Sequence, residues 1–151
     1  MAITYDMERI KERQKLSSQG IFYSVQRIDL LIVSISGAGI YLCLETLKYL
    51  KVNNIELGIL IKWSGGILLL AIIVNFISQF LGNKSNYYEY LYCESILESD
   101  NEPSDIQQAE ISKYDCISDV YDKFTTIFNY TSALLMLSGL VLLISYFLFI
   151  F

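Results

Sequence analysis

Three stretches of this chain carry no charged residue and approach or exceed the length needed to cross a lipid bilayer. They cover residues 30–44, 63–83 and 124–151, which are 15, 21 and 28 residues long. A bilayer core about 30 Å thick requires about 20 helical residues, because a helix rises about 1.5 Å per residue. Extension of the first stretch to Ile28 and Leu47 places Asp29 and Glu45 near the lipid head groups. The sequence therefore predicts an all-α membrane protein with three transmembrane helices.

The composition excludes several classes of protein. Hydrophobic residues make up 54% and charged residues 18%, against roughly 45–50% and 25% in soluble proteins. Histidine is absent, which removes the commonest general base and metal ligand. The three cysteines show no Cys-x-x-Cys spacing. We find no nucleophile–base or metal-ligand pattern, so we expect no enzyme activity, no cofactor and no metal site.

The charge pattern divides the chain into five segments. Residues 1–27 are predicted to form a cytoplasmic amphipathic helix, and residues 83–123 an acidic cytoplasmic helical hairpin. Transmembrane helices are predicted over residues 28–50, 55–82 and 124–151. A cytoplasmic N-terminus places eight Lys or Arg residues inside and three outside, as the positive-inside rule favours. The chain is thus predicted to be a multi-pass protein of the inner (plasma) membrane.

The N-terminal segment has helical periodicity. Ile3, Met7 and Ile10 recur on one face, and Gly20 is a candidate break before Ile21. Two placements remain open for this helix. It lies on the membrane surface, or it packs against its own subunit.

The segment between the second and third stretches is strongly acidic. Residues 83–123 contain ten Asp or Glu and three Lys. Ser104, directly after Pro103 and three positions before Gln107, predicts a helix start with a capping box, and Gly82-Asn83 is expected to end or bend the preceding helix. The hairpin is predicted to dock a basic cytoplasmic protein through Glu94, Glu98 and Asp105, or to serve as a solvated stalk. Aromatic rings such as the tyrosines near residue 90 can stack with nucleotide bases. The acidic surroundings repel phosphates, however, so no nucleic-acid partner is expected.

Each apolar stretch also contains small or polar residues at helical spacing. In lipid, helices associate through close packing and hydrogen bonds at such positions, which predicts a homo-oligomer. The candidates for helix packing or for lining a water-filled pore are Ser34, Gly37, Ala71, Asn75, Gln79, Ser138 and Gly139. Both interpretations remain open, although amides within a membrane span are costly unless they are paired.

The order of these parts resembles that of the SLATT family of small bacterial membrane effectors. The matching pieces are Met7-Glu-Arg-Ile-Lys-Glu-Arg-Gln-Lys15, the span around Ser34-Ile-Ser-Gly-Ala-Gly39, the span from Trp63 to Leu81 and the helix after Asn86. The third apolar stretch is an addition to the two-span pattern of that family. The resemblance implies a pore-forming effector in bacterial antiviral defence, which a sensor component triggers at the inner membrane.

Two functions follow as hypotheses. The first is a homo-oligomeric inner-membrane effector, pore- or channel-like, that is triggered through its cytoplasmic hairpin. The second is a non-conducting membrane sensor or scaffold that recruits a cytoplasmic protein partner.

Overall fold

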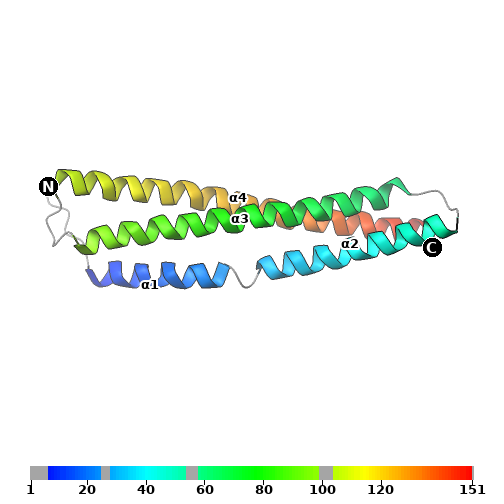
Figure 1. The fold of residues 1–151 in the computed structure, drawn as a ribbon, viewed down its shortest axis with the longest axis horizontal. Helices are drawn as coiled ribbons and strands as arrows, with labels where there is room; N and C mark the ends of the chain where they lie inside the picture. Colours follow the sequence, from blue (N-terminus) through cyan, green and yellow to red (C-terminus); the bar gives the residue numbers. More distant parts are fainter. Residues whose placement is uncertain (1–6, 25–27, 54–57, 99–103, 151) are drawn as a thin grey trace. The chain divides into compact units, whose positions relative to one another are not determined.

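The computed structural model describes residues 7–24, 28–53, 58–98 and 104–150, and all regular structure in this part of the chain is α-helical (Figure 1). The helices are α1 (Met7–Ser24), α2 (Ile28–Val52), α3 (Ile59–Glu98) and α4 (Asp105–Ile150). Helices α2, α3 and α4 are long and apolar enough to cross a membrane, with mean hydropathies of 1.8, 2.0 and 2.2 in their most apolar windows. The predicted all-α fold with three candidate membrane spans and a short N-terminal helix is confirmed.

Helices α3 and α4 are longer than a bilayer requires. They contain 40 and 46 residues, or about 60 and 69 Å at 1.5 Å per residue, against a hydrocarbon core of about 30 Å. About half of each helix therefore extends beyond the apolar core. The charged residues that begin with Lys84 in α3 and end with Lys123 in α4 mark the halves that lie outside.

Two predicted helix ends do not occur, at Gly20 and at Gly82-Asn83, where a bend was the other prediction. Helix α1 continues through Gly20 to Ser24, and α3 continues through Gly82 and Asn83. A Cβ added at Gly20 would lie 3.4 Å from Asn86 Oδ1, and one at Gly82 would lie 3.3 Å from Thr125 Cγ2. Both glycines therefore permit close approach of a neighbouring helix, which explains their presence within continuous helices.

The chain forms two compact units. Unit 1 comprises residues 1–26 and 79–126, and unit 2 comprises residues 27–78 and 127–151. Each unit therefore takes one part of α3 and one part of α4, and adds α1 or α2 respectively.

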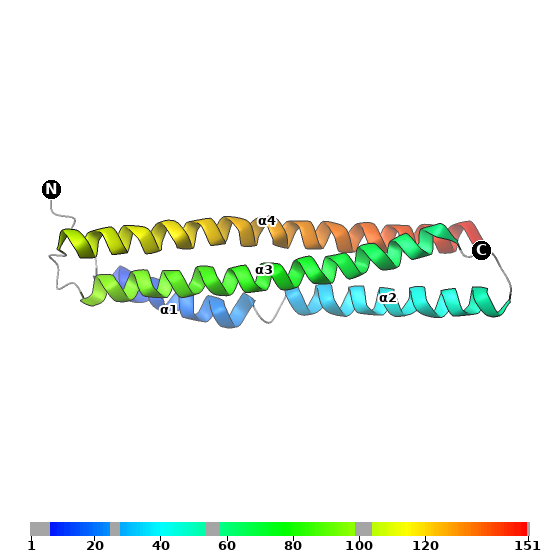
Figure 2. The ribbon, with the colours of Figure 1, turned by 45° about the horizontal axis from the view of Figure 1, so that its top comes forward.

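Unit 2 packs α2 along the first part of α3, as Figure 2 shows, with the last part of α4 completing the bundle. The buried positions of α3 alternate in steps of three and four residues: Ile61, Ser64, Leu68, Ala71, Asn75 and Ser78. The same spacing in α2 buries Asp29, Ile32, Ser36, Gly39 and Cys43. This is the seven-residue repeat of supercoiled helices. Large apolar residues such as Leu70, Ile73 and Phe76 instead lie on the outer surface of unit 2.

Two adjacent layers hold the helices of unit 2 together. Cys43 Sγ lies 3.8 Å from Ser64 Oγ, and Ser64 Oγ donates a 2.8 Å hydrogen bond to Gly139 O. One turn further along α3, Leu68 fills the space between two glycines. A Cβ at Gly39 would lie 2.6 Å from Leu68 Cδ1, and one at Gly139 would lie 2.7 Å from Leu68 Cγ. The missing side chains of both glycines thus make room for one leucine.

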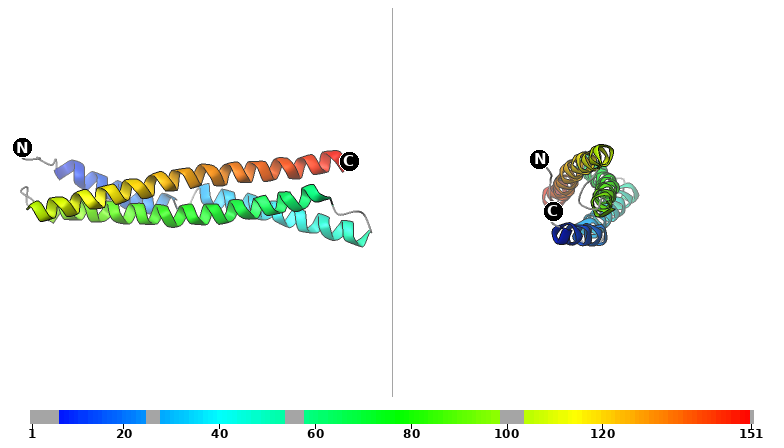
Figure 3. Two further views of the ribbon diagram at one scale, coloured as in Figure 1. Left: turned by 90° about the horizontal axis from the view of Figure 1, so that it is seen from above. Right: turned by 90° about the vertical axis from the view of Figure 1, so that its left-hand side faces the viewer.

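Unit 1 packs α1 against the last part of α3 (Figure 1), and the first part of α4 runs alongside the same part of α3 (Figure 3). Its apolar core contains Ile10 of α1, Cys93 and Ile96 of α3, and Ile111 of α4. The burial of Ile10 shows that α1 packs against its own chain, the second of the two predicted placements. Ile3, which the prediction put on the same face, lies outside the described residues.

The predicted helix start at Ser104 is confirmed. Gln107 N donates to Ser104 Oγ at 3.4 Å, and Ser104 N donates to Gln107 Oε1 at 3.0 Å. These reciprocal bonds satisfy two amide groups at the beginning of α4, where the helix itself offers no acceptor. The residues that join the two arms of the predicted hairpin, 99–103, lie outside the described residues.

The Leu68 layer predicts a steric effect at Gly139. In the variant Gly139→Ala, the new methyl group meets Leu68, which cannot retreat because Gly39 and its helix close the other side. Overpacking of this kind costs about 1–3 kcal/mol. We expect a lower melting temperature for the detergent-solubilised variant, measured by circular dichroism.

Gly66→Ala is the matched control, because a Cβ there meets no atom within 4 Å. Both variants share the gain in helix propensity that alanine brings over glycine. Equal melting temperatures for the two variants would show that the close contact at Gly139 is not significant.

Candidate functional site

Polar side chains fill much of the interior of unit 2. Five of them, all with no exposed surface, define the polar seam: Ser36, Ser64, Asn75, Ser78 and Ser132. Helix α2 contributes one of these residues, α3 three and α4 one. Polar groups at such positions are rare in an apolar bundle and need internal partners, because lipid offers none.

Three of the seam residues have hydrogen-bond partners. Ser64 Oγ donates to Gly139 O, as described above. Ser78 Oγ donates to Asn129 Oδ1 at 2.7 Å, and Ser132 Oγ donates to Asn129 O at 2.9 Å. The bond from Ser64 and that from Ser78 connect α3 with α4.

The other two seam residues are unpaired. Within the part of the chain that the structure describes, neither Ser36 Oγ nor the Nδ2 and Oδ1 atoms of Asn75 have a hydrogen-bond partner. Asn75 lies on α3 between Leu68, which contacts Gly139, and Ser78, which bonds Asn129. The register therefore places it opposite Ser132. A buried donor or acceptor without a partner costs about 1–3 kcal/mol, so the amide of Asn75 destabilises the packed arrangement.

The predicted packing or pore residues occupy two kinds of position. Ala71, Asn75 and Gly139 are buried in unit 2, and Gln79 is half-buried at the start of the α3 segment of unit 1. Ser34, Gly37 and Ser138 lie on the outer surface of unit 2. A Cβ at Gly37 meets no atom within 4 Å, and Ser138 Oγ donates to Leu135 O of its own helix at 2.9 Å. These three residues therefore take no part in helix packing within one chain.

The prediction included Gly139 of α4 but omitted three other residues that pack inside unit 2, Ser36 and Gly39 of α2 and Ser132 of α4. Ser36 and Gly39 face the interior of unit 2, whereas Ser34 and Gly37 face outward. Ser132 of α4 likewise faces the interior of unit 2. The spacing along α2 does not separate the two faces, because the outward residues Ser34, Gly37, Tyr41 and Leu44 follow the same three-four pattern as the buried residues from Asp29 to Cys43.

A polar cluster joins the three helices of unit 1. Arg13 of α1 forms an ion pair with Glu89 of α3, with 2.5 Å between Nε and Oε1. Ser118 of α4 donates to Glu89 Oε2 at 3.5 Å and to Ser85 O at 3.1 Å, and Ser85 Oγ donates in return to Ser118 O at 3.1 Å. Glu89 thus connects α1 with α4.

The ion pair is stronger than a typical surface pair because Glu89 is largely enclosed, with 15% of its side chain exposed. Partial burial lowers the pKa of Arg13, but attraction by Glu89, Tyr92 and Asp115 outweighs it, and the pKa is raised. The guanidinium also lies 5.2 Å from the centre of the Tyr92 ring. Arg13 is therefore the main polar attachment of α1 to the hairpin.

The tyrosines of the hairpin interact mainly with one another. The Tyr88 ring stacks on Tyr121, with 5.8 Å between centroids and 5° between planes, and on Tyr114 at 6.4 Å and 30°. Tyr87 meets Tyr88 edge-on at 5.7 Å. These contacts pack α3 against α4, so the tyrosine cluster has a structural explanation.

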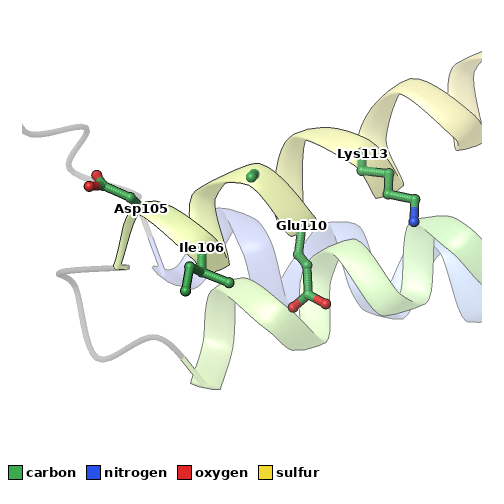
Figure 4. A pocket seen from close by; sticks show the side chains of 5 residues that line it. Asp105, Ile106, Glu110 and Lys113 are labelled. Atoms are coloured by element: carbon green, nitrogen blue, oxygen red, sulfur yellow. The ribbon is translucent and has the colours of Figure 1, made fainter.

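A surface cavity of about 410 Å³ lies at the beginning of α4 and is lined by Asp105, Ile106, Ala109, Glu110 and Lys113. In Figure 4, Ile106 and Glu110 project from the same side of the helix, while Asp105 extends from its first turn. The side chain of Ile106 is 78% exposed. The cavity therefore combines two carboxylates with an apolar surface, and it contains one of the three predicted docking residues.

The other two predicted docking residues lie on α3. Glu98 is exposed and Glu94 half-buried, and Glu94 Oε1 accepts a 3.3 Å hydrogen bond from Tyr90 Oη. The negative charge of Glu94, together with this bond, raises the pKa of Tyr90. Neither residue lines the cavity at α4.

The cysteines of unit 1 differ in reactivity. Cys93 is buried, and burial together with the charge of Glu89 raises its pKa to about 11, although Arg13 lowers it. Cys116 is exposed. At pH 8 we expect maleimide to label Cys116 rapidly, while Cys93 reacts at least about 100-fold more slowly, because the thiolate is the reactive form.

Mass spectrometry of the labelled peptides measures both rates in folded and urea-denatured protein. The variant Cys116→Ser should lose the fast reaction and keep the slow one. Rapid labelling of Cys93 in the folded protein would contradict the packing of unit 1.

Two regions thus stand out as candidate functional sites, the polar seam of unit 2 and the acidic surface of unit 1. Among the described residues, no three His, Cys, Asp or Glu side chains lie where they could hold a metal ion. Comparisons of the chain with protein-family models, with curated proteins and with solved structures gave no match.

Proposed function

We propose that this chain is a homo-oligomeric effector of the bacterial inner membrane that forms a pore in antiviral defence. Its N-terminus and unit 1 lie in the cytoplasm, and the hairpin of unit 1 receives the trigger. The observation that supports this proposal best is the unpaired, fully buried amide of Asn75 within the polar seam.

In the resting arrangement, some buried polar side chains lack hydrogen-bond partners among the described residues. The side chains of Ser36 and Asn75 form no hydrogen bond that would stabilise the packed helices. Burial of these polar groups costs free energy, so it favours separation of the helices. Separation of the helices allows water to solvate both residues. The free energy recovered is of the order of the coupling energies that drive switching between two packed arrangements.

The outer surface of unit 2 supports assembly of several copies. Ser34, Gly37 and Ser138 are exposed there, and a second helix can approach the backbone closely at Gly37. Helices in lipid associate through small residues of this kind. Assembly through this face leaves the polar seam available to line a water-filled path. The role in antiviral defence rests on the resemblance to the SLATT family.

A substitution at Asn75 tests this function. Asn75→Leu removes the unpaired amide, so we expect the solubilised resting protein to gain about 1–3 kcal/mol in stability. The same change removes a polar group from the open path, so depolarisation after induced expression, followed with a voltage-sensitive dye, should decrease.

Phe76→Leu is the matched control, because the neighbouring Phe76 is 57% exposed on the outer surface. This variant should change neither the stability of the resting protein nor the depolarisation appreciably. Failure of the wild-type chain to depolarise cells in the presence of its triggering partner would contradict a pore, and an undiminished leak in Asn75→Leu would contradict the role of the seam.

A second candidate function is a non-conducting sensor or scaffold that recruits a basic protein segment. The cavity at the start of α4 favours it, because Asp105 and Glu110 line it beside the exposed Ile106 and outnumber its one cation, Lys113. Opposite charges steer and orient such a partner, and the apolar floor adds contact area. Unit 2 would then serve only as a membrane anchor.

Charge reversal separates this candidate from the first. The triple variant Glu94→Lys, Glu98→Lys, Asp105→Lys should lose capture of the cytoplasmic partner in a pull-down, with at least a tenfold decrease in recovered protein. A control that reverses the exposed Asp119 and Asp122 on α4 should retain capture. Equal capture by both variants would contradict docking at the predicted residues.

A further inference from the structure

We propose that unit 2 contains a binding site for the phosphate group of an anionic membrane phospholipid, at the end where α2 finishes and α3 begins. A cavity of about 400 Å³ lies there. Three lysines line it, Lys48 and Lys51 from α2 and Lys62 from α3, above an apolar floor of Leu44 and Leu47. This combination matches a lipid, which presents a charged head and an apolar chain to the same surface.

The cavity carries a net positive charge. Glu45 accepts a 2.6 Å hydrogen bond from Lys48 Nζ and offsets one of the three lysines. Neither Lys51 nor Lys62 forms an ion pair with any residue in the described ranges, and both are exposed. Two ammonium groups thus remain available to donate hydrogen bonds to phosphate oxygens. Each is a compact positive charge on a flexible side chain.

The surrounding aromatic residues place this cavity at the level of the head groups. Trp63 is 63% exposed, Tyr49 62% and Tyr41 63%. Exposed tryptophan and tyrosine near the ends of apolar helices lie at the boundary between lipid and water. Lysines at this depth extend toward the aqueous side while their stems cover apolar surface. The floor formed by Leu44 and Leu47 then lies at the depth of the first carbons of an acyl chain.

The choice of an anionic lipid follows from charge. A zwitterionic head group brings its own cation, which the lysines repel, whereas phosphatidylglycerol presents an unbalanced phosphate. Clustered lysines near an anionic lipid surface attract it by about 1 kcal/mol per residue. This inference rests on the location of unit 2 in a bilayer and is independent of pore formation, so either can fail without the other.

Native mass spectrometry of the full chain tests the site. The protein is released from nanodiscs of phosphatidylcholine that contain one-fifth phosphatidylglycerol, and the retained lipids are counted. We expect bound phosphatidylglycerol in the wild type, and a loss on the order of 100-fold in affinity for Lys48→Gln, Lys51→Gln, Lys62→Gln, since each lysine near a charged surface contributes about fivefold.

Two further variants keep the test decisive. Lys48→Arg, Lys51→Arg, Lys62→Arg preserves the charge and should retain the lipid. Lys11→Gln, Lys113→Gln, Lys123→Gln alters the net charge equally but changes only residues of unit 1, and it should also retain the lipid. Equal lipid loss in both glutamine variants would overturn the proposal, because the effect would then reflect overall charge.

A soluble competitor distinguishes a lipid from a free anion. Inorganic phosphate at millimolar concentration should displace little phosphatidylglycerol, because it makes no contact with Leu44 or Leu47. Complete displacement by inorganic phosphate, or retention of phosphatidylcholine in equal amounts, would overturn the assignment to an anionic lipid.

Discussion

The absence of water within a bilayer constrains this protein more than any other condition. Apolar side chains gain little there by leaving lipid for the protein interior, so helices associate through contact and hydrogen bonding. Unit 2 meets this condition with small residues such as Ser64 and Ala71 among its buried positions, beside an apolar cluster that contains Ile61, Leu143 and Tyr146. Leu68 between Gly39 and Gly139, and the bond from Ser64 to Gly139 O, bring three helices together at one point.

The sequence predicted the helical class, the three candidate spans and the capping box at Ser104, because each depends on local composition or spacing. Two of the residues predicted in the second apolar stretch, Ala71 and Asn75, are buried in unit 2, on the same face of α3 as Ser64. It could not select the buried face of α2. The segment from Ser34 to Gly39 places small residues on both sides of the helix, and only the contact with Leu68 distinguishes Gly39 from Gly37. The roles predicted for Glu94 and Glu98 remain predictions.

Gly20 and Gly82 illustrate a second limit of sequence reasoning. A glycine in a helical pattern lowers helix propensity, which favoured breaks at both positions, but each one faces a side chain of a neighbouring helix at 3.3–3.4 Å from the place of its missing Cβ. Tertiary contact outweighs propensity here. The placement of α1 was open for the same reason, because its amphipathic face suits lipid and protein equally. The burial of Ile10 and the ion pair of Arg13 with the largely enclosed Glu89 show that α1 packs against its own chain.

The two units differ in how well their polar groups are satisfied. In unit 1 the serines of α3 and α4 bond each other reciprocally, and Glu89 accepts from both flanking helices. The buried polar side-chain atoms that lack a partner, among the described residues, all belong to unit 2, on Ser36, Asn75 and Tyr146. A trigger received by unit 1 would have to disrupt satisfied bonds, whereas rearrangement of unit 2 offers new partners to unsatisfied groups. The buried polar groups that would gain partners on rearrangement therefore belong, among the described residues, to the apolar unit.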